Sequence, residues 1–211
     1  LLEICALTDT LILDEDGIYD PAHFNDRLLL GLKGTMSEAE IHFMRARLRG
    51  GILNKARRGE LRTILPVGFV YDADGRIVLD PDQQVRESIR LLFATFRRTG
   101  AVSATVREFR VQGWKFPVRP ACGPHQGELL WGALKRTRAR YILRNPRFAG
   151  AYVYGRHRSR KKVDGTGYVN RAVAPDQWYA LLRDAHPGYI GWEEYEDNLR
   201  RLRENARASG Q

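Results

Sequence analysis

The side chains with the clearest chemical implication in this 211-residue chain lie between residues 135 and 162. This window holds eleven lysines and arginines and not one aspartate or glutamate. Tyr141, Phe148 and Tyr152 are interleaved with them. Lysine and arginine attract phosphate groups and hydrogen-bond to them, so a basic block of this density indicates a polyanion as partner. Nucleic acid is the leading candidate.

A second basic stretch lies upstream, from residue 45 to residue 62. It holds seven basic residues against one acid, Glu60, whereas residues 1–44 hold two basic and nine acidic ones. The whole chain has a formal charge of +10 and a pI near 9.9. Two basic stretches separated by a neutral one indicate two contact zones on a long ligand. The alternative is a pair of solvated helix faces, which is the usual meaning of a single charge run.

An amphipathic helix is predicted at the start of the 135–162 block. Arg136, Thr137 and Arg140 share one of its faces at helical spacing, and apolar side chains that include Trp131 and Tyr141 share the opposite face. Arginine pairs with guanine edges in the major groove, and threonine can contact a thymine methyl group. The pattern predicts that the polar face reads bases and that the apolar face anchors the helix.

Clustered carboxylates near the N-terminus offer a rival chemistry, because such clusters can hold Mg²⁺. Turn and helix-cap signals coincide with the cluster and account for it without a metal. The five histidines have no ligand spacing, so zinc chemistry has no support either. We therefore expect no metal and no cofactor. The carboxylates are Asp14, Glu15, Asp16 and Asp20.

The two cysteines, Cys5 and Cys122, are far apart and form no paired motif, which argues against a zinc ribbon and a disulfide framework within these residues. No apolar run approaches 18 residues and no signal peptide is recognisable. These features predict a cytoplasmic protein without a membrane partner, associated with the nucleoid if the source is bacterial.

The coarse pattern predicts a mixture of helices and short hairpins. A strand at about 10–14 is expected to belong to a parallel sheet whose other strands lie upstream. Ser37 and Glu40 fit a capping box that opens a long helix running to about Gly59. Further predictions are a hairpin over 67–79, helices from Asp80-Pro81 to Gly100 and from 102 to 113, a loop at 114–128, a helix over 130–143, a strand over 148–154, a basic loop at 156–162, a return strand at 168–173 and a final helix over 192–206.

Several of these segments together resemble a known family. The run from Gly31 to Glu40 resembles the end of a serine-recombinase catalytic domain. The segments 66–71, 78–81, 142–150 and 186–195 resemble the "recombinase" DNA-binding domain of large serine recombinases. The most specific element is Leu143-Arg144-Asn145-Pro146, which is followed by an aromatic residue and a glycine.

The resemblance implies an α+β fold that is mostly helical. It divides the chain into a C-terminal remnant of an α/β catalytic domain (1–35), a long helix with a basic linker (36–65) and a helical DNA-binding domain with small β-hairpins (66–211). Members of the family cut DNA with a serine hydroxyl and exchange strands as tetramers. In the family that serine precedes the part represented here, and Ile41 stands where an arginine is common.

The sequence thus predicts the DNA-binding portion of a site-specific serine recombinase that integrates or excises DNA of a mobile element. This chain alone is expected to be catalytically inactive and to contain no catalytic residue. Its expected partners are double-stranded DNA and a second copy of itself, in a homodimer that becomes a tetramer in the full-length protein. The alternative is a sequence-tolerant architectural protein that binds RNA or DNA. The predicted DNA-binding residues are Arg45, Arg49, Lys55, Arg57, Arg58, Arg62, Lys135, Arg136, Thr137, Arg140, Arg144, Arg156, Arg158, Arg160 and Lys161.

Overall fold

The computed structural model describes residues 2–120 and 122–208. The chain divides between Asn54 and Lys55 into two compact units, which are described separately below. None of the described helices combines the length and the apolar character that crossing a membrane requires.

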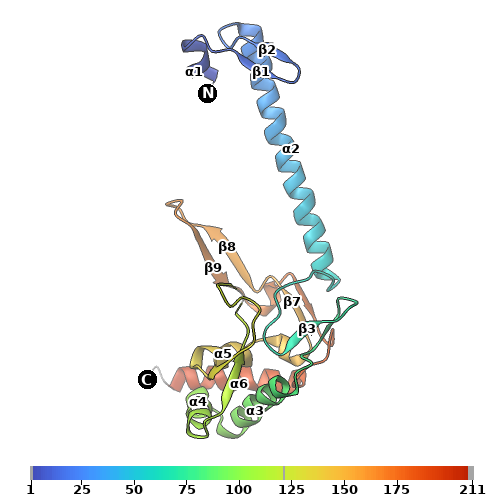
Figure 1. Ribbon diagram of the computed structural model, residues 1–211, viewed down its shortest axis with the longest axis vertical. Helices are drawn as coiled ribbons and strands as arrows, with labels where there is room; N and C mark the ends of the chain where they lie inside the picture. Colours follow the sequence, from blue (N-terminus) through green and yellow to red (C-terminus); the bar gives the residue numbers. More distant parts are fainter. Residues whose placement is uncertain (1, 121, 209–211) are drawn as a thin grey trace. The chain divides into compact units, whose positions relative to one another are not determined.

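The first unit contains a helix, a short hairpin and most of a long helix (Figure 1). The strand predicted near 10–14 is present, and it pairs antiparallel with the strand that follows it, a hairpin that the sequence did not predict. The cause is local. The Asp14 carboxylate accepts hydrogen bonds from the backbone amides of Asp16 and Gly17, at 2.9 and 3.1 Å, and this turn reverses the chain. The elements are α1 (Leu2–Leu7), β1 (Ile12–Asp14), β2 (Gly17–Tyr19) and α2 (Phe24–Arg57).

Helix α2 is continuous over 34 residues, so the predicted start at Ser37 is wrong. A mid-helix glycine costs only about 1 kcal/mol relative to alanine, which is too little for Gly50 and Gly51 to interrupt a long hydrogen-bonded helix. The end is where the sequence predicted it. Gly59, in the left-handed conformation with φ 76°, donates to the carbonyl of Ala56, and Glu60 donates to that of Lys55. This is a Schellman motif.

The second unit joins helices to four antiparallel strand pairs, which confirms the predicted α+β class. The pairs are β3 with β4, β5 with β6, β7 with β10, and β8 with β9. Its elements are β3 (Phe69–Tyr71), β4 (Ile77–Leu79), α3 (Gln83–Thr99), α4 (Val102–Val111), β5 (Lys115–Val118), β6 (Leu130–Ala133), α5 (Arg136–Leu143), the 3₁₀ helix η1 (Pro146–Ala149), β7 (Tyr152–Tyr154), β8 (His157–Lys161), β9 (Tyr168–Ala172), the 3₁₀ helix η2 (Pro175–Gln177), β10 (Ala180–Leu182) and α6 (Trp192–Ala208).

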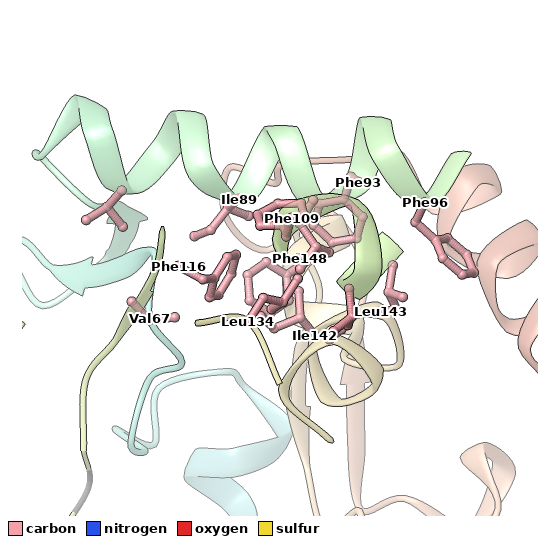
Figure 2. Close-up of a cluster of buried hydrophobic side chains, with 14 of the residues drawn as sticks. Val67, Ile89, Phe93, Phe96, Phe109, Phe116, Leu134, Ile142, Leu143 and Phe148 are labelled. Carbon is pink, nitrogen blue, oxygen red and sulfur yellow. The ribbon is translucent and has the colours of Figure 1, made fainter. Parts of the chain in front are cut away.

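A core of large apolar side chains holds this unit together (Figure 2). Ile89, Phe93 and Phe96 project from α3, and Phe148 reaches the same cluster from η1. The Phe148 ring is fully buried, with ring centroids 5.3 Å from Phe69 and 5.7 Å from Phe93. Burial of these rings is the main source of stability for the surrounding helices.

Four predicted elements differ from the structure. In the strand predicted over 148–154, only Tyr152–Tyr154 is a strand (β7), and its first residues belong to the 3₁₀ helix η1, where the Asn145 side chain caps the turn. The other three differ because of strand pairing. The helix predicted over 130–143 is a strand (β6) followed by a shorter helix (α5), and the loop predicted at 114–128 contains β5, which pairs with β6. The basic loop predicted at 156–162 is the strand β8. In each case hydrogen bonds to a partner strand override the helical or loop character of the local sequence.

Helix α3 begins later than predicted. Its N-cap is Asp82, whose carboxylate accepts from the Gln84 amide at 2.8 Å. Asp80 is instead buried and accepts a 2.9 Å hydrogen bond from the Arg119 guanidinium.

Candidate functional site

Helix α5 presents the residues that the sequence singled out as base readers. It packs against α4 and α6 through the buried side chains of Ala139, Ile142 and Leu143. Arg136, Thr137 and Arg140 are exposed. Positions i, i+1 and i+4 of a helix point to the same side, so these three side chains share the outer face.

The prediction that Trp131 and Tyr141 anchor this helix is wrong. Trp131 lies on β6, where it pairs with Pro117, and its side chain is 40% exposed. Tyr141 is 47% exposed. Helix α5 instead packs against its neighbours through Ala139, Ile142 and Leu143, and the rings of Trp131 and Tyr141 are partly exposed.

The end of α5 is tied to the chain that leads into β8. Asn145 is buried, and its side-chain oxygen accepts a 3.0 Å hydrogen bond from Nη1 of Arg156. Nη2 of Arg156 donates to the backbone carbonyl of Arg144 at 3.3 Å. Arg156 therefore links two segments of the basic block, and both of its hydrogen-bond partners are neutral.

An open cavity of about 420 Å³ lies beside this link. Arg140 lines it from α5 and Arg144 from the residue after that helix, and Arg156 and His157 line it from the start of the hairpin. Trp178 and Tyr195 are among the rings that form its wall, and the Arg156 guanidinium lies 5.8 Å from the Trp178 ring centroid. No acidic side chain is among the described residues around it.

The environment of Arg156 disfavours its positive charge. Burial lowers the pKa of this guanidinium, and the nearby cations Arg147 and Arg144 add to the effect, although contacts with Tyr141 and Tyr195 oppose it. Withdrawing a cation from water without an acidic partner costs free energy. An anion in the cavity would offset that cost.

Strands β8 and β9 form a two-stranded ribbon that extends from the rest of this unit (Figure 1). Arg158 and Arg160 lie on one face of β8, and Arg171 lies directly opposite Arg158 on β9. Lys161 lies on the other face. All ten residues of the two strands are exposed, so the ribbon has no core that would require these side chains. Like charges opposite one another destabilise a hairpin, whereas a polyanion between them would stabilise it.

Within the second unit, residues 61–64 at the end of the basic linker are held by neutral contacts. Arg147 is buried and donates to the Ile64 carbonyl at 2.7 Å and to the Thr63 hydroxyl at 2.6 Å. Tyr152 donates to the Leu61 carbonyl at 3.1 Å. Arg147, the one arginine of the basic block that is buried, therefore positions the linker backbone.

The remaining predicted residues are exposed along α2 and the segment after it. Arg45 and Arg49 belong to the first unit, and Lys55 and Arg57 lie at the end of α2. Arg58 forms a 2.8 Å ion pair with Glu60, and the Arg62 guanidinium lies 5.4 Å from the Tyr71 ring centroid.

In the acidic cluster near the N-terminus, the Lys33 side chain lies between the carboxylates of Asp14 and Asp16. The Lys33 ammonium donates to Asp14 at 2.9 Å, to Asp16 at 2.7 Å and to the Tyr19 hydroxyl at 2.8 Å. The Lys33 hydrogen bond is the main reason that the pKa of Asp14 is lowered. An ammonium group between these carboxylates disfavours the rival interpretation as a magnesium site.

The structure thus brings Thr137, Arg140, Arg144 and Arg156 to one cavity, with Lys135 and Arg136 at the start of the same helix. Sequence reasoning did not find Trp178 and Tyr195 as members of that wall. No local signal marks them, because Trp178 directly follows η2 and Tyr195 lies on α6, and both elements follow α5 by dozens of residues.

The chain is similar to a protein family, to a bacterial protein and to a solved structure. A family model described as Recombinase matches residues 83–205. A protein of Sinorhizobium fredii (strain NBRC 101917 / NGR234), named uncharacterized protein y4bA/y4pH, is 54% identical over 206 residues. The match covers 98% of this chain but 30% of that protein, so the chain spans less than a third of its relative. Among solved structures, the crystal structure of an LSR–DNA complex is 11% identical with a TM-score of 0.46, covering 74% of this chain and 38% of that one.

Proposed function

This chain belongs to the Recombinase family of serine recombinases, and on that premise we propose that it is the DNA-binding portion of a site-specific recombinase that integrates or excises DNA. The observation that carries the proposal is the basic surface of the second unit formed by α5 and by the strands β8 and β9, whose own residues include no acid. Helices and two-stranded ribbons both fit the major groove of B-DNA.

In this proposal the predicted residues have different roles. Arg136, Thr137 and Arg140 read base edges, and Arg144 holds a phosphate. Arg158, Arg160 and Lys161 contact DNA from the ribbon. The other predicted residues, from Arg45 to Arg62 and at Lys135 and Arg156, bind the phosphate backbone or support those that do. Phosphate contacts fix register, and base contacts carry sequence information.

We propose further that the serine nucleophile of the recombination reaction lies outside residues 1–211. The described serines have other surroundings. Ser37 lies within α2, and Ser88 donates to the Lys115 carbonyl at 3.2 Å. Ser159 hydrogen-bonds with Asn170 on the ribbon. An activated serine needs a neighbouring base, and the hydrogen-bond partners of Ser88 and Ser159 are a backbone carbonyl and an amide side chain.

The first prediction tests whether this chain binds DNA without cutting it. The purified chain should bind duplex DNA in a gel-shift titration and form no covalent adduct with it, because binding needs only the basic surface. The duplex should be one that the chain itself enriches from a random-sequence pool. Preference for that duplex over random duplex and over RNA at raised salt separates the proposal from a sequence-tolerant architectural protein. Adducts resistant to denaturant, on any duplex, would contradict it.

The second prediction concerns the linker. We expect the combined change of Arg57, Arg58 and Arg62 to alanine to weaken binding to all duplexes alike. The slope of log K against log salt should fall by about one unit for each phosphate that the variant no longer neutralises. The matched control removes the same charge from exposed positions on α4 and α6, at Arg107, Arg110 and Arg203. A slope equal to that of the control variant would exclude linker contacts with phosphates.

The third prediction concerns self-association. Ile41, Met44, Leu48 and Ile52 are 42–62% exposed on α2 and follow one another at helical spacing. We propose that a second copy covers this stripe in a homodimer. Met44→Glu with Leu48→Glu should shift the sedimentation profile to a monomer and raise hydrogen exchange in residues 2–35. Ala46→Glu, on another side of the helix, should leave both measurements unchanged. A monomeric parent chain at high concentration would refute the dimer.

A further inference from the structure

The cavity of about 420 Å³ beside the end of α5 has a composition that ordinary folding does not explain. Three guanidinium groups line it, from Arg140, Arg144 and Arg156, and the described lining contains no acid to balance them. Two of these arginines are exposed, but Arg156 is partly buried. Its hydrogen bonds to Asn145 and to the Arg144 carbonyl use only two of its five N–H groups.

Other donors surround the same space. The Thr137 hydroxyl, the His157 imidazole and the Tyr195 hydroxyl belong to side chains of the wall. Tyr195 is buried, and its hydroxyl donates to the Arg144 carbonyl at 3.5 Å, so it supports the segment that carries Arg144. The volume falls within the range of about 300–1,000 Å³ that small-ligand sites occupy. A tetrahedral oxyanion accepts several charge-assisted hydrogen bonds at once, and that is what this donor set offers.

We propose that this cavity is a seat for one phosphate group of a DNA strand, held by Arg144 and Arg156 with the charge of Arg140 beside it. The inference rests on the proposed function, because it takes the phosphate from bound DNA. It differs from a surface phosphate contact in one respect. The seat is concave and joins α5 to the start of the ribbon, so a phosphate within it fixes both elements on the backbone at a single position.

A backbone scan tests the seat. The probe is a set of duplexes of the sequence that the chain enriches from a random pool, each with one phosphate replaced by an uncharged methylphosphonate. With the parent chain we expect one position in each bound site at which affinity falls about tenfold, which is what loss of one or two charge-assisted hydrogen bonds implies. With Arg144→Gln the intact duplex should bind about tenfold more weakly, and the methylphosphonate at that position should cost clearly less than it costs the parent chain, because only Arg156 then remains to hold the phosphate.

Arg156→Gln should give the same result, but it also removes the hydrogen bonds to the end of α5. Arg144→Gln is therefore the decisive variant, because the Arg144 side chain is exposed and its loss leaves those bonds in place. Arg107→Gln, an exposed arginine on α4, is the matched control and should retain full sensitivity at the same position.

A second arm separates DNA from free phosphate as the source of the anion. Inorganic phosphate titrated into the chain should shift the side-chain NMR resonance of Arg156, and added duplex should abolish further shifts by phosphate. If phosphate still shifts the resonance when duplex is bound, the seat does not hold DNA and the inference fails. A different outcome is that the chain binds duplex, but that each methylphosphonate lowers the affinity of Arg144→Gln by the same factor as that of the parent chain. The inference then fails, while the proposed function stands. Failure to bind any duplex would overturn both.

Discussion

Replacing Arg136 with alanine is expected to lower the affinity of the chain for its cognate duplex by about ten- to a hundredfold, because a bidentate arginine–guanine contact contributes about 1–3 kcal/mol of discrimination. Arg140→Ala should have a similar effect. Arg136 gives the cleaner test, since Arg140 also lines the cavity at the end of α5. Random duplex, held mainly through its backbone, should lose much less.

The measurement is a pair of titrations at matched salt, on the enriched duplex and on random duplex. Arg107→Ala removes an exposed arginine from α4 and serves as the control for the removal of charge. Equal losses on both duplexes for Arg136→Ala would assign the outer face of α5 to phosphate binding. Sequence readout would then have to come from the ribbon, and Arg158→Ala and Arg160→Ala would be the variants to compare.

The second large effect concerns stability. Phe148→Ala should destabilise the second unit by about 3–5 kcal/mol, because it deletes a fully buried ring and leaves a cavity among other aromatic rings. Phe148 packs against Phe69, Phe93 and Tyr189, with centroids 5.3–5.9 Å away. The loss should be visible in urea unfolding followed by tryptophan fluorescence, since all four tryptophans lie beyond residue 113.

Val111→Ala is the control for this change, because its side chain is 75% exposed on α4. It should alter the free energy of unfolding by no more than about 0.5 kcal/mol. A loss for Phe148→Ala no greater than that of the control would mean that the aromatic cluster does not support the fold. Phe148→Leu should fall between the two, since it keeps part of the buried apolar volume.

The parts of the fold that the sequence predicts correctly are those with local causes. The β3–β4 hairpin follows from the turn at Asp72–Gly75, where the Gly75 amide donates to the Asp72 carbonyl at 3.0 Å. The ends of α2 and α3 follow from Gly59 and Gly100, which adopt the left-handed conformation that glycine tolerates best. The motifs that carry the family resemblance are local as well.

The largest error in the basic region comes from a contact that no local pattern contains. Trp131 fits a helix by periodicity, but its segment pairs with Lys115–Val118 as a strand. Charge and spacing alone predict the chemical roles of the basic block. Within the basic block, α5 has an exposed outer face, Arg147 is buried against the linker backbone, and Arg156 lines the cavity. These different positions depend on residues distant in sequence, such as Thr63, which accepts a hydrogen bond from Arg147 across 84 positions.

The β8–β9 ribbon has a consequence for how such a protein can change. None of its ten strand residues is buried, and turn and backbone hydrogen bonds define its shape. Substitutions there create no cavity and leave no buried polar group without a partner. They should therefore change the free energy of unfolding of the domain only slightly. Helix α5 is constrained on one side by its packing, whereas neither face of the ribbon is buried, and its Arg158 contacts the rest of the unit through a 3.4 Å hydrogen bond to the Gln177 carbonyl. A library that varies Arg158, Arg160 and Arg171 would therefore be a practical route to altered target preference, with folded protein expected for nearly every member.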